Sequence, residues 1–233
     1  IQVTTPISKA QLESEPEAKQ ESGAVPAVTS GPSEETKGPV LTPPSDSSAA
    51  ASTWDNTLAA RLRTILSNGN IEDITEDILP EEMRKLKGLK QSPPHEGLDP
   101  LQHTLSVVRI LDTQGLSGKL AEYLRTAALF HDIGKLKDPI DINHPITSGT
   151  LAQPILVRMG YKPEEIAIIR KLIETHDIFG ELIKGYLSVQ QVIEELRPPE
   201  DSDMTLIELL ELCYRLTKAD VLAIPGMKQR ASK

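Results

Sequence analysis

The sequence predicts an all-α fold, and three observations carry this prediction. From residue 52 on, apolar residues recur three or four positions apart, which is the spacing of one helix face. Glycines and prolines separate these stretches at the places where helices are expected to end and begin. Apolar and polar residues nowhere alternate over the length that a half-buried strand requires. Residues 52–233 are therefore expected to form a single compact helical domain.

Residues 1–51 are expected to form a disordered tail or linker before that domain. They hold seven of the 18 prolines and none of the aromatic residues, and Ser, Thr, Glu and Gly fill the gaps. Such a segment buries too little apolar surface to offset the entropy that it would lose on ordering.

The first four helices are expected in the first part of the domain. Apolar residues at helical spacing predict a helix over 54–68, which Gly69 ends. A proline opens a short helix over 80–86. Aspartate and serine are preferred N-cap residues, and they begin the helices expected over 99–112 and 117–131.

The last four helices are expected in the second part of the domain. Prolines open those over 145–159 and 163–176, and Pro154 is expected to bend the first of them. A serine N-cap begins the helix over 188–196, and an aspartate leads a long helix over 203–224.

The composition excludes several classes of protein. The formal net charge of −9 argues against a surface for duplex DNA, because Lys and Arg make most contacts to phosphate. No stretch approaches the ~18 consecutive apolar residues of a membrane span, and the N-terminal residues lack the pattern of a secretory signal. The one cysteine, Cys213, allows no disulfide within the chain. These features predict a cytoplasmic protein that binds neither duplex DNA nor a membrane.

Four of the expected helices each place one ionisable residue on an otherwise apolar face. His103 lies on the apolar face of its helix. His131, His176 and Asp220 each follow the last apolar residue of a stripe. A buried carboxylate costs several kcal/mol unless it is paired or bound to a cation. Four such residues therefore indicate one shared cation rather than four unrelated core residues.

The residue types suit a site for hard divalent cations. Imidazole nitrogens and carboxylate oxygens bind iron, manganese, cobalt or zinc, and the lack of cysteine ligands argues against a closed structural zinc site. His131 and Asp132 both reach one ion only if the backbone turns there, and Gly134 is expected to provide this turn. The candidate ligands suit two ions ~3.5–4 Å apart. They are His103, His131, Asp132, His144, His176 and Asp220.

One motif and its spacing point to a known family. His103, the run His-Asp-Ile-Gly-Lys at 131–135 and Asp220 occur in the order found in the HD-domain superfamily of metal-dependent phosphohydrolases. The chain resembles this superfamily over about residues 94–224, which is the expected core of the domain. Residues 94–105 also resemble the HD region of CCA-adding tRNA nucleotidyltransferases and their stand-alone relatives, although no nucleotidyltransferase head precedes them.

The resemblance implies two divalent ions, drawn from Fe, Mn, Co, Ni, Mg and Zn. Family members hydrolyse phosphate esters, often nucleotides, cyclic nucleotides or RNA ends, with a metal-bound water as the nucleophile. The implied partner is therefore a small-molecule nucleotide or related phosphate ester, or an RNA end. The implied ligand sets are His103, His131, Asp132 and Asp220 for one ion, and His144, His176 and bridging Asp132 for the other.

Asp132 and Lys135 are the candidate catalytic residues. Asp132 is expected to bridge the ions, and Lys135 to contact a substrate phosphate unless it is an ordinary surface lysine after a turn. His95 and Asp177 are further candidates for substrate binding, as is Lys135. The alternatives are that His95 is an ordinary loop histidine and that Asp177 supports a neighbouring ligand or ends a helix.

Two other functions stay open from the sequence. A few HD-type proteins use the same six ligands to hold a mixed-valent di-iron pair that activates oxygen. The chain is alternatively a regulatory or scaffolding HD module of a larger protein, which its linker-like start and basic end favour. The run 185–187, Gly-Tyr-Leu, lacks the proline of the GYP element of cyclic-di-GMP phosphodiesterases, so that substrate is not assigned. The sequence also leaves the oligomeric state open.

Overall fold

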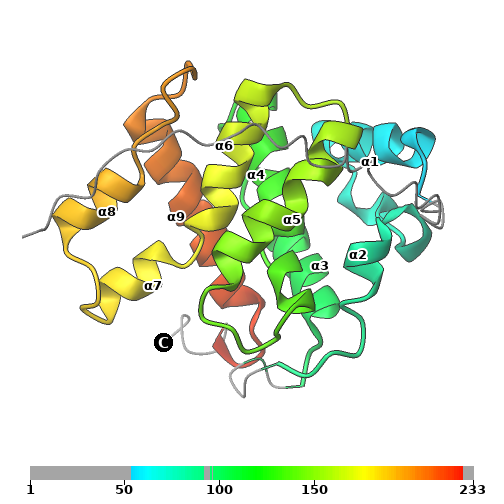
Figure 1. Ribbon diagram of the computed structural model, residues 1–233, viewed down its shortest axis with the longest axis horizontal. Helices are drawn as coiled ribbons and strands as arrows, with labels where there is room; N and C mark the ends of the chain where they lie inside the picture. Colours follow the sequence, from blue (N-terminus) through cyan, green and yellow to red (C-terminus); the bar gives the residue numbers. More distant parts are fainter. Residues whose placement is uncertain (1–53, 92–94, 96, 228–233) are drawn as a thin grey trace, which may run out of the picture. The chain divides into compact units, whose positions relative to one another are not determined.

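Helices make up the described structure of the chain. The computed structural model describes residues 54–91, 95 and 97–227, and within these ranges it contains helices and no strand (Figure 1). The prediction of an all-α fold is confirmed. The tail expected over residues 1–51 lies outside the described residues and stays a prediction. No helix in the described part has the length and apolar character needed to cross a membrane.

The helices lie close to where the sequence predicts them, with one addition. The eight expected helices correspond to α1–α6, α8 and α9, and the additional helix is α7. Short 3-10 helices lie between some of them. In the described residues the elements are α1 (Asn56–Asn68), η1 (Ile71–Asp73), η2 (Glu76–Ile78), α2 (Glu81–Arg84), α3 (Pro100–Ile110), α4 (Gly118–Phe130), η4 (Ile133–Leu136), α5 (His144–Arg158), α6 (Pro163–Glu174), α7 (Ile178–Ile183), α8 (Val189–Glu195) and α9 (Leu206–Ala223).

Capping side chains explain where helices begin. Asp99 forms a capping box at the start of α3, as its position in the sequence predicts. The start of α9 differs from the prediction, because Thr205 and Glu208 form its capping box and Asp203 does not. A threonine hydroxyl that accepts from the N–H three residues on satisfies a helix-end donor that would otherwise have no partner.

α4 packs against more of the described helices than any other element around the site. It contacts α1, α3, α5, α6 and α9, and every residue from Thr126 to Phe130 is buried. Burial of apolar surface stabilises such packing by about 25 cal/mol per Å². The helix ends at His131, so this histidine lies at the edge of the core rather than at the surface.

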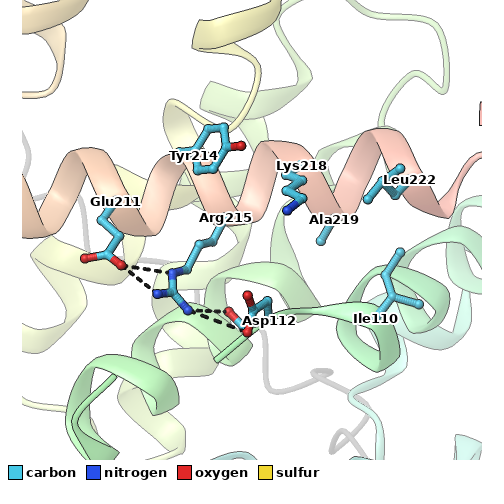
Figure 2. Close-up of a pocket in the computed structure, with 8 residues that line it drawn as sticks. All are labelled: Ile110, Asp112, Glu211, Tyr214, Arg215, Lys218, Ala219 and Leu222. Atoms are coloured by element: carbon cyan, nitrogen blue, oxygen red, sulfur yellow. Dashed lines mark hydrogen bonds and ion pairs between the residues drawn. The ribbon is translucent and has the colours of Figure 1, made fainter. Parts of the chain in front are cut away.

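Arg215 fastens α9 to the end of α3, beside the groove that Figure 2 shows. Its guanidinium donates to Glu211 Oε1 at 2.6 Å and to the backbone carbonyls of Asp112 and Gln114 at 3.1 and 2.9 Å. These contacts hold α9 against the loop that follows α3. Asp220, further along α9, thereby comes to face α3.

A second set of hydrogen bonds ties α9 to the end of α6. Thr217 Oγ1 donates to the carbonyl of His176 at 2.7 Å, and the Cys213 thiol donates to the carbonyl of Thr175 at 3.2 Å. Burial raises the pKa of the Cys213 thiol to about 12, so the thiol keeps the proton that it donates. The segment that carries His176 is therefore held against α9.

The turn after α4 brings η4 against the start of α5. Asp132 makes this turn, with φ −105° and ψ 5°. Gly134 does not adopt a left-handed conformation. A Cβ at Gly134 would lie 2.3 Å from the His144 carbonyl oxygen, and its N–H donates to Ser148 Oγ at 2.8 Å. The prediction that Gly134 supplies conformational freedom is wrong, and the glycine is needed because two backbones approach closely.

Candidate metal centre

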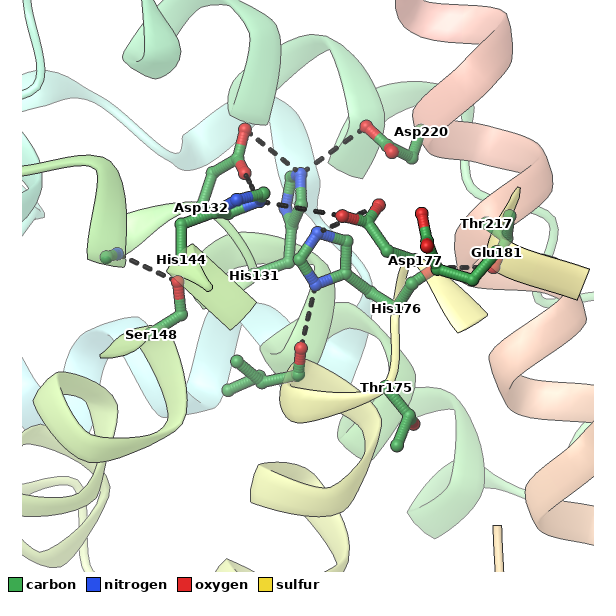
Figure 3. Close-up of polar contacts among 12 residues, drawn as sticks. His131, Asp132, His144, Ser148, Thr175, His176, Asp177, Glu181, Thr217 and Asp220 are labelled. Atoms are coloured by element: carbon green, nitrogen blue, oxygen red, sulfur yellow. Dashed lines mark hydrogen bonds and ion pairs between the residues drawn. The ribbon is translucent and has the colours of Figure 1, made fainter. Parts of the chain in front are cut away.

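The structure places the six candidate ligands in one cluster, whose centre is drawn in Figure 3. The cluster lies where α3, the end of α4, the start of α5, the end of α6 and α9 meet. Three groups of side chains there each bring ligand atoms within 4.8 Å of one another. They are His103, His131 and Asp220; His131, Asp132 and His176; and His144, His176 and Asp177.

All five histidines of the chain lie at this point. The ring centroids are 5.0 Å apart for His95 and His103, and 5.7 Å apart for His103 and His131. They are 5.0 Å apart for His131 and His176, and 5.2 Å apart for His144 and His176. Because imidazole is the commonest metal ligand in proteins, this concentration of histidines favours a metal site over ordinary core packing.

Asp132 faces histidines with both of its carboxylate oxygens. Oδ2 lies 3.4 Å from His131 Nε2 and 3.9 Å from His103 Nε2. Oδ1 lies 3.2 Å from His144 Nε2. One oxygen therefore faces each half of the cluster, which is the arrangement expected of a carboxylate that bridges two ions.

Backbone hydrogen bonds fix the orientation of three of the imidazole rings. In each ring Nδ1 donates to the carbonyl three residues earlier in the chain, so a neutral ring carries its lone pair on Nε2. The same kind of hydrogen bond orients metal-binding histidines in general. The three pairs are His131 with Ala128 at 2.8 Å, His144 with Asp141 at 2.9 Å and His176 with Ile173 at 2.7 Å.

His103 is oriented differently from the other three. Its Nε2 donates a direct hydrogen bond of 2.6 Å to Asp220 Oδ1. Its Nδ1 is buried and has no hydrogen-bond partner among the described residues. His103 and Asp220 therefore form a pair at the edge of the cluster next to His131.

His131 Nε2 gives the clearest evidence that the cluster fits a cation. The atom is buried and makes no hydrogen bond within the described part of the chain. It lies 3.4 Å from Asp132 Oδ2 and 3.5 Å from Asp220 Oδ1. These distances exceed those of N–H···O hydrogen bonds, but they match the ~3–3.5 Å that separates donors bound to one ion at ~2.1 Å. The donor set therefore fits a divalent cation.

The charges of the cluster shift the pKa values of its members in opposite directions. Burial alone would raise the pKa of Asp132, but the charges of His131 and Lys135 outweigh it and hold that pKa well below its usual range. Burial is likewise outweighed at Asp220, where contacts with His103 and His131 lower the pKa. Burial would lower the pKa of His131, but Asp132 and Asp220 raise it to about 10. In the absence of a cation, the two carboxylates therefore keep His131 protonated.

Lys135 is buried in the cluster. Its Nζ donates to Asp132 Oδ2 at 2.8 Å and to Gln91 Oε1 at 2.9 Å, and its side chain is 8% exposed. The alternative of an ordinary surface lysine is therefore wrong. Sequence reasoning missed Gln91, because its position in a loop has no pattern that predicts a contact with Lys135.

An open cavity of about 430 Å³ leads to the cluster. This volume lies within the range of small-molecule sites. The three candidates for substrate binding, His95, Lys135 and Asp177, all line it. Sequence reasoning missed the acidic and apolar side chains around them, which come from loops and short helices. They include Asp141, Glu181, Ile140, Ile142 and Ile224.

Comparison with known proteins agrees with this geometry. A model of the HD domain matches residues 101–212 of the chain. The matched range contains five of the six candidate ligands, and Asp220 joins them from the part of α9 that follows it. No curated protein matches the chain, so the narrower resemblance to CCA-adding nucleotidyltransferases has no further support. The motif, the helical fold and the family match together show that the chain belongs to the HD-domain superfamily.

Proposed function

We propose that this chain is a metal-dependent phosphohydrolase that cleaves a small phosphate ester, such as a nucleotide, at a site for two divalent cations. Membership of the HD-domain superfamily supports a hydrolytic reaction, because HD-domain proteins are generally hydrolases. The position of Asp132 carries the proposal of two ions. Its two oxygens face different histidines, so one side chain serves both halves of the cluster.

The cluster divides into two sets of ligands that share Asp132. Divalent cations bound there lower the pKa of coordinated water and neutralise charge on phosphoryl oxygens. The chain contributes rings that are already oriented, because the Nδ1 hydrogen bonds keep the Nε2 lone pairs directed inward. The first set is His103, His131, Asp220 and Asp132 Oδ2, and the second contains His144, His176 and Asp132 Oδ1.

Lys135 is expected to position Asp132 and to attract the phosphate. Its Nζ lies 2.8 Å from Asp132 Oδ2 and lines the cavity. A positive charge in such a partly enclosed site acts on an anion more strongly than it would in water. His95 lines the same cavity and is the other candidate for contact with the ester.

The cavity favours an ester with a single phosphoryl group. Its volume of about 430 Å³ suits a ligand of mononucleotide size. The two lysines that line it, Lys135 and Lys184, already pair with Asp132 and Glu181, so the lining offers no unpaired lysine for the further phosphates of a nucleoside triphosphate. Nucleoside monophosphates and cyclic nucleotides are therefore the first substrates to examine.

Hydrolysis assays on Mn²⁺-loaded and Fe²⁺-loaded protein test the proposal. The substrates are p-nitrophenyl phosphate, bis-p-nitrophenyl phosphate, nucleoside monophosphates and cyclic nucleotides. Turnover is expected to require metal and to fall at least ~100-fold in Asp132→Asn. Asp201→Asn, which removes an exposed carboxylate outside the cluster, is expected to keep full activity.

The same samples distinguish the two other functions. Oxygen consumption is measured with an electrode beside phosphate release. Oxygen uptake without hydrolysis, in excess of the bound iron and dependent on an added organic substrate, would favour the di-iron oxygenase, which requires the same donors. Metal-loaded protein with neither activity on any of these substrates would favour the scaffolding module.

A further inference from the structure

Asp177 lies beside the cluster, and its local structure does not explain its position. It follows His176 directly and is the N-cap residue of α7, but its side chain caps no N–H of that helix. The side chain is 45% exposed and lines the cavity. Asp177 therefore lies at a helix end, as one alternative predicts, and its carbonyl accepts from Glu181 N–H at 3.1 Å, but its side chain takes no part in capping the helix.

The carboxylate of Asp177 instead faces two histidines (Figure 3). Oδ1 lies 3.5 Å from His176 Nε2, and Oδ2 lies 3.9 Å from His144 Nε2. A carboxylate that supports a histidine ligand from outside accepts a hydrogen bond from the ring nitrogen that faces away from the ion. Both Nδ1 atoms already donate to the backbone carbonyls of Asp141 and Ile173. Asp177 therefore faces the nitrogens that are free to bind an ion.

These three side chains are complementary to a cation placed between them. Because Nδ1 carries the hydrogen, neutral His144 and His176 both present the Nε2 lone pair to the carboxylate. Lone pairs and a carboxylate repel one another at such distances. Among the described residues, no Lys or Arg forms an ion pair with Asp177 that would relieve this repulsion.

We propose that Asp177 is a direct ligand of the second ion, an inference that rests on the two-cation site proposed above. The two sites then have the same composition. Each contains two histidines, one carboxylate of its own and one oxygen of Asp132. The sets are His103, His131, Asp220 and Asp132 Oδ2, and His144, His176, Asp177 and Asp132 Oδ1.

Asp177 also sets the charge of the centre. Asp132, Asp177 and Asp220 carry three negative charges, and two divalent cations carry four positive charges. The centre therefore keeps one positive charge, which attracts an anionic ester. Without Asp177, only two neutral rings and a shared carboxylate would hold the second ion, so that ion is expected to bind more weakly.

Titration of the chelator-treated chain with Co²⁺, followed by the visible absorption of the bound ion, tests this assignment. The wild-type chain is expected to bind two ions. Asp177→Ala is expected to keep the first ion and to bind the second at least ~10-fold more weakly. The absorption of the second ion is expected to change, because one oxygen donor is lost. Asp177→His, which supplies a nitrogen donor, is expected to recover affinity with a shifted absorption band.

Glu181→Gln is the matched control. Glu181 lines the same cavity but pairs with Lys184 rather than with the histidines, so both affinities are expected to stay within about threefold of wild type. Unchanged affinity and absorption in Asp177→Ala would overturn the role of Asp177 and leave the two-cation site in place. Fewer than two ions in the wild type would overturn both.

Folding of the variants is checked separately. Asp177 is partly exposed and caps no helix, so metal-free Asp177→Ala is expected to keep the circular dichroism and melting temperature of the wild type. The titration is repeated with Asp177→Asn, whose side chain has nearly the same shape as that of aspartate. This variant is also expected to bind the second ion more weakly than the wild type. Full binding of two ions by this variant, with unchanged absorption, would also overturn the assignment.

Discussion

In the proposed metal centre, a proton and a cation compete for Nε2 of His131. Its Nε2 lies between Asp132 and Asp220. Burial alone would lower the pKa of its imidazole, but these carboxylates raise it to about 10. A histidine must be neutral to bind a metal. Binding of the first ion at neutral pH is therefore expected to release about one proton from His131.

This competition predicts the direction of the pH dependence. Metal affinity is expected to rise about tenfold per pH unit between roughly pH 7 and pH 9, where the metal-free His131 is protonated. Calorimetric titration with Mn²⁺ in two buffers of different ionisation enthalpy measures the protons released. An affinity that does not change over this range, with no proton released, would contradict the assignment of His131.

The stability of the metal-free protein is expected to change with pH in the direction opposite to metal affinity. The folded pKa of His131 is raised above its ordinary value of 6.5 to about 10. Its contribution to the free energy of unfolding is therefore fully present below about pH 6.5 and is lost as the pH rises towards 10. Urea unfolding of chelator-treated protein at several pH values measures this loss.

Substitution of Lys135 distinguishes metal binding from catalysis. Lys135→Met removes the buried charge beside Asp132 and the cavity, but it removes no expected ligand. Two ions are expected to remain, while kcat/KM for phosphate esters falls about 10- to 100-fold. Lys137→Met, at an exposed position on the same turn, is the matched control and is expected to change neither. Loss of an ion from Lys135→Met would show that Lys135 is needed for the binding of metal.

Several of these residues could be found from sequence and others could not. Helical spacing identified His131, His176 and Asp220, because an ionisable residue at the end of an apolar stripe is visible without a structure. The burial of Lys135 could not be predicted, since a four-residue 3-10 helix has no useful periodicity. The direction of the Asp177 side chain depends on how α7 leaves the end of α6, which no local pattern encodes.

At the scale of elements, the close contact of η4 with α5 gives a direct test. Gly134→Ala would place a Cβ 2.3 Å from the His144 carbonyl oxygen, and this backbone atom cannot rotate away. The start of α5 is therefore expected to shift, with a loss of about 1–3 kcal/mol in the free energy of unfolding. Because His144 is the first residue of α5, the second ion is also expected to be lost.

Gly180→Ala, inside α7, is the control for this substitution. Apart from the chain neighbours and the backbone of α7 itself, no described atom lies within 4 Å of the added Cβ, so the change is expected to be neutral or to stabilise the fold by up to about 1 kcal/mol. Urea unfolding and metal analysis of both variants give the comparison. A Gly134→Ala protein with the stability and metal content of the wild type would contradict the proposed contact.

The start and type of most helices follow from caps, prolines and periodicity, and the exceptions have physical causes. α7 was not predicted, because its six residues complete fewer than two turns and show no repeated apolar face. The start of α9 was placed at Asp203, although the capping box of Thr205 and Glu208 was present in the sequence. α5 continues through Pro154 to Arg158 as one helix, and the bend expected at this proline stays a prediction.

At the scale of the whole domain, metal binding and folding are expected to be linked. The cluster joins α3, α4, α5, α6 and α9, and unfolding separates its ligands. Free metal at 100 times its dissociation constant is expected to add about 2.7 kcal/mol to stability for each ion bound. This corresponds to a rise of roughly 5–10 °C in Tm. Differential scanning calorimetry of the Mn²⁺-loaded and the chelator-treated protein measures this rise in Tm. Equal Tm values in the two samples would contradict the linkage between metal binding and folding.

The fold class of the domain was predictable, but the packing of its helices was not. Periodicity shows which face of each helix is buried, whereas the partner of that face depends on residues far apart in the chain. The contacts of Arg215 and Thr217 that orient α9 cross from one helix to another and leave no pattern in the sequence. The geometry that brings Asp220 to His103 could therefore be found only in the structure.

The number of metal ions bound per chain bears most directly on the two-cation centre. Elemental analysis is made on protein purified without chelator, and again after anaerobic loading with Fe²⁺ or Mn²⁺. Two ions per chain are expected, with both lost or strongly weakened in Asp132→Asn and both kept in Asp201→Asn. A wild-type chain that never holds more than one ion, or an Asp132→Asn chain that keeps two in full, would contradict a centre bridged by Asp132.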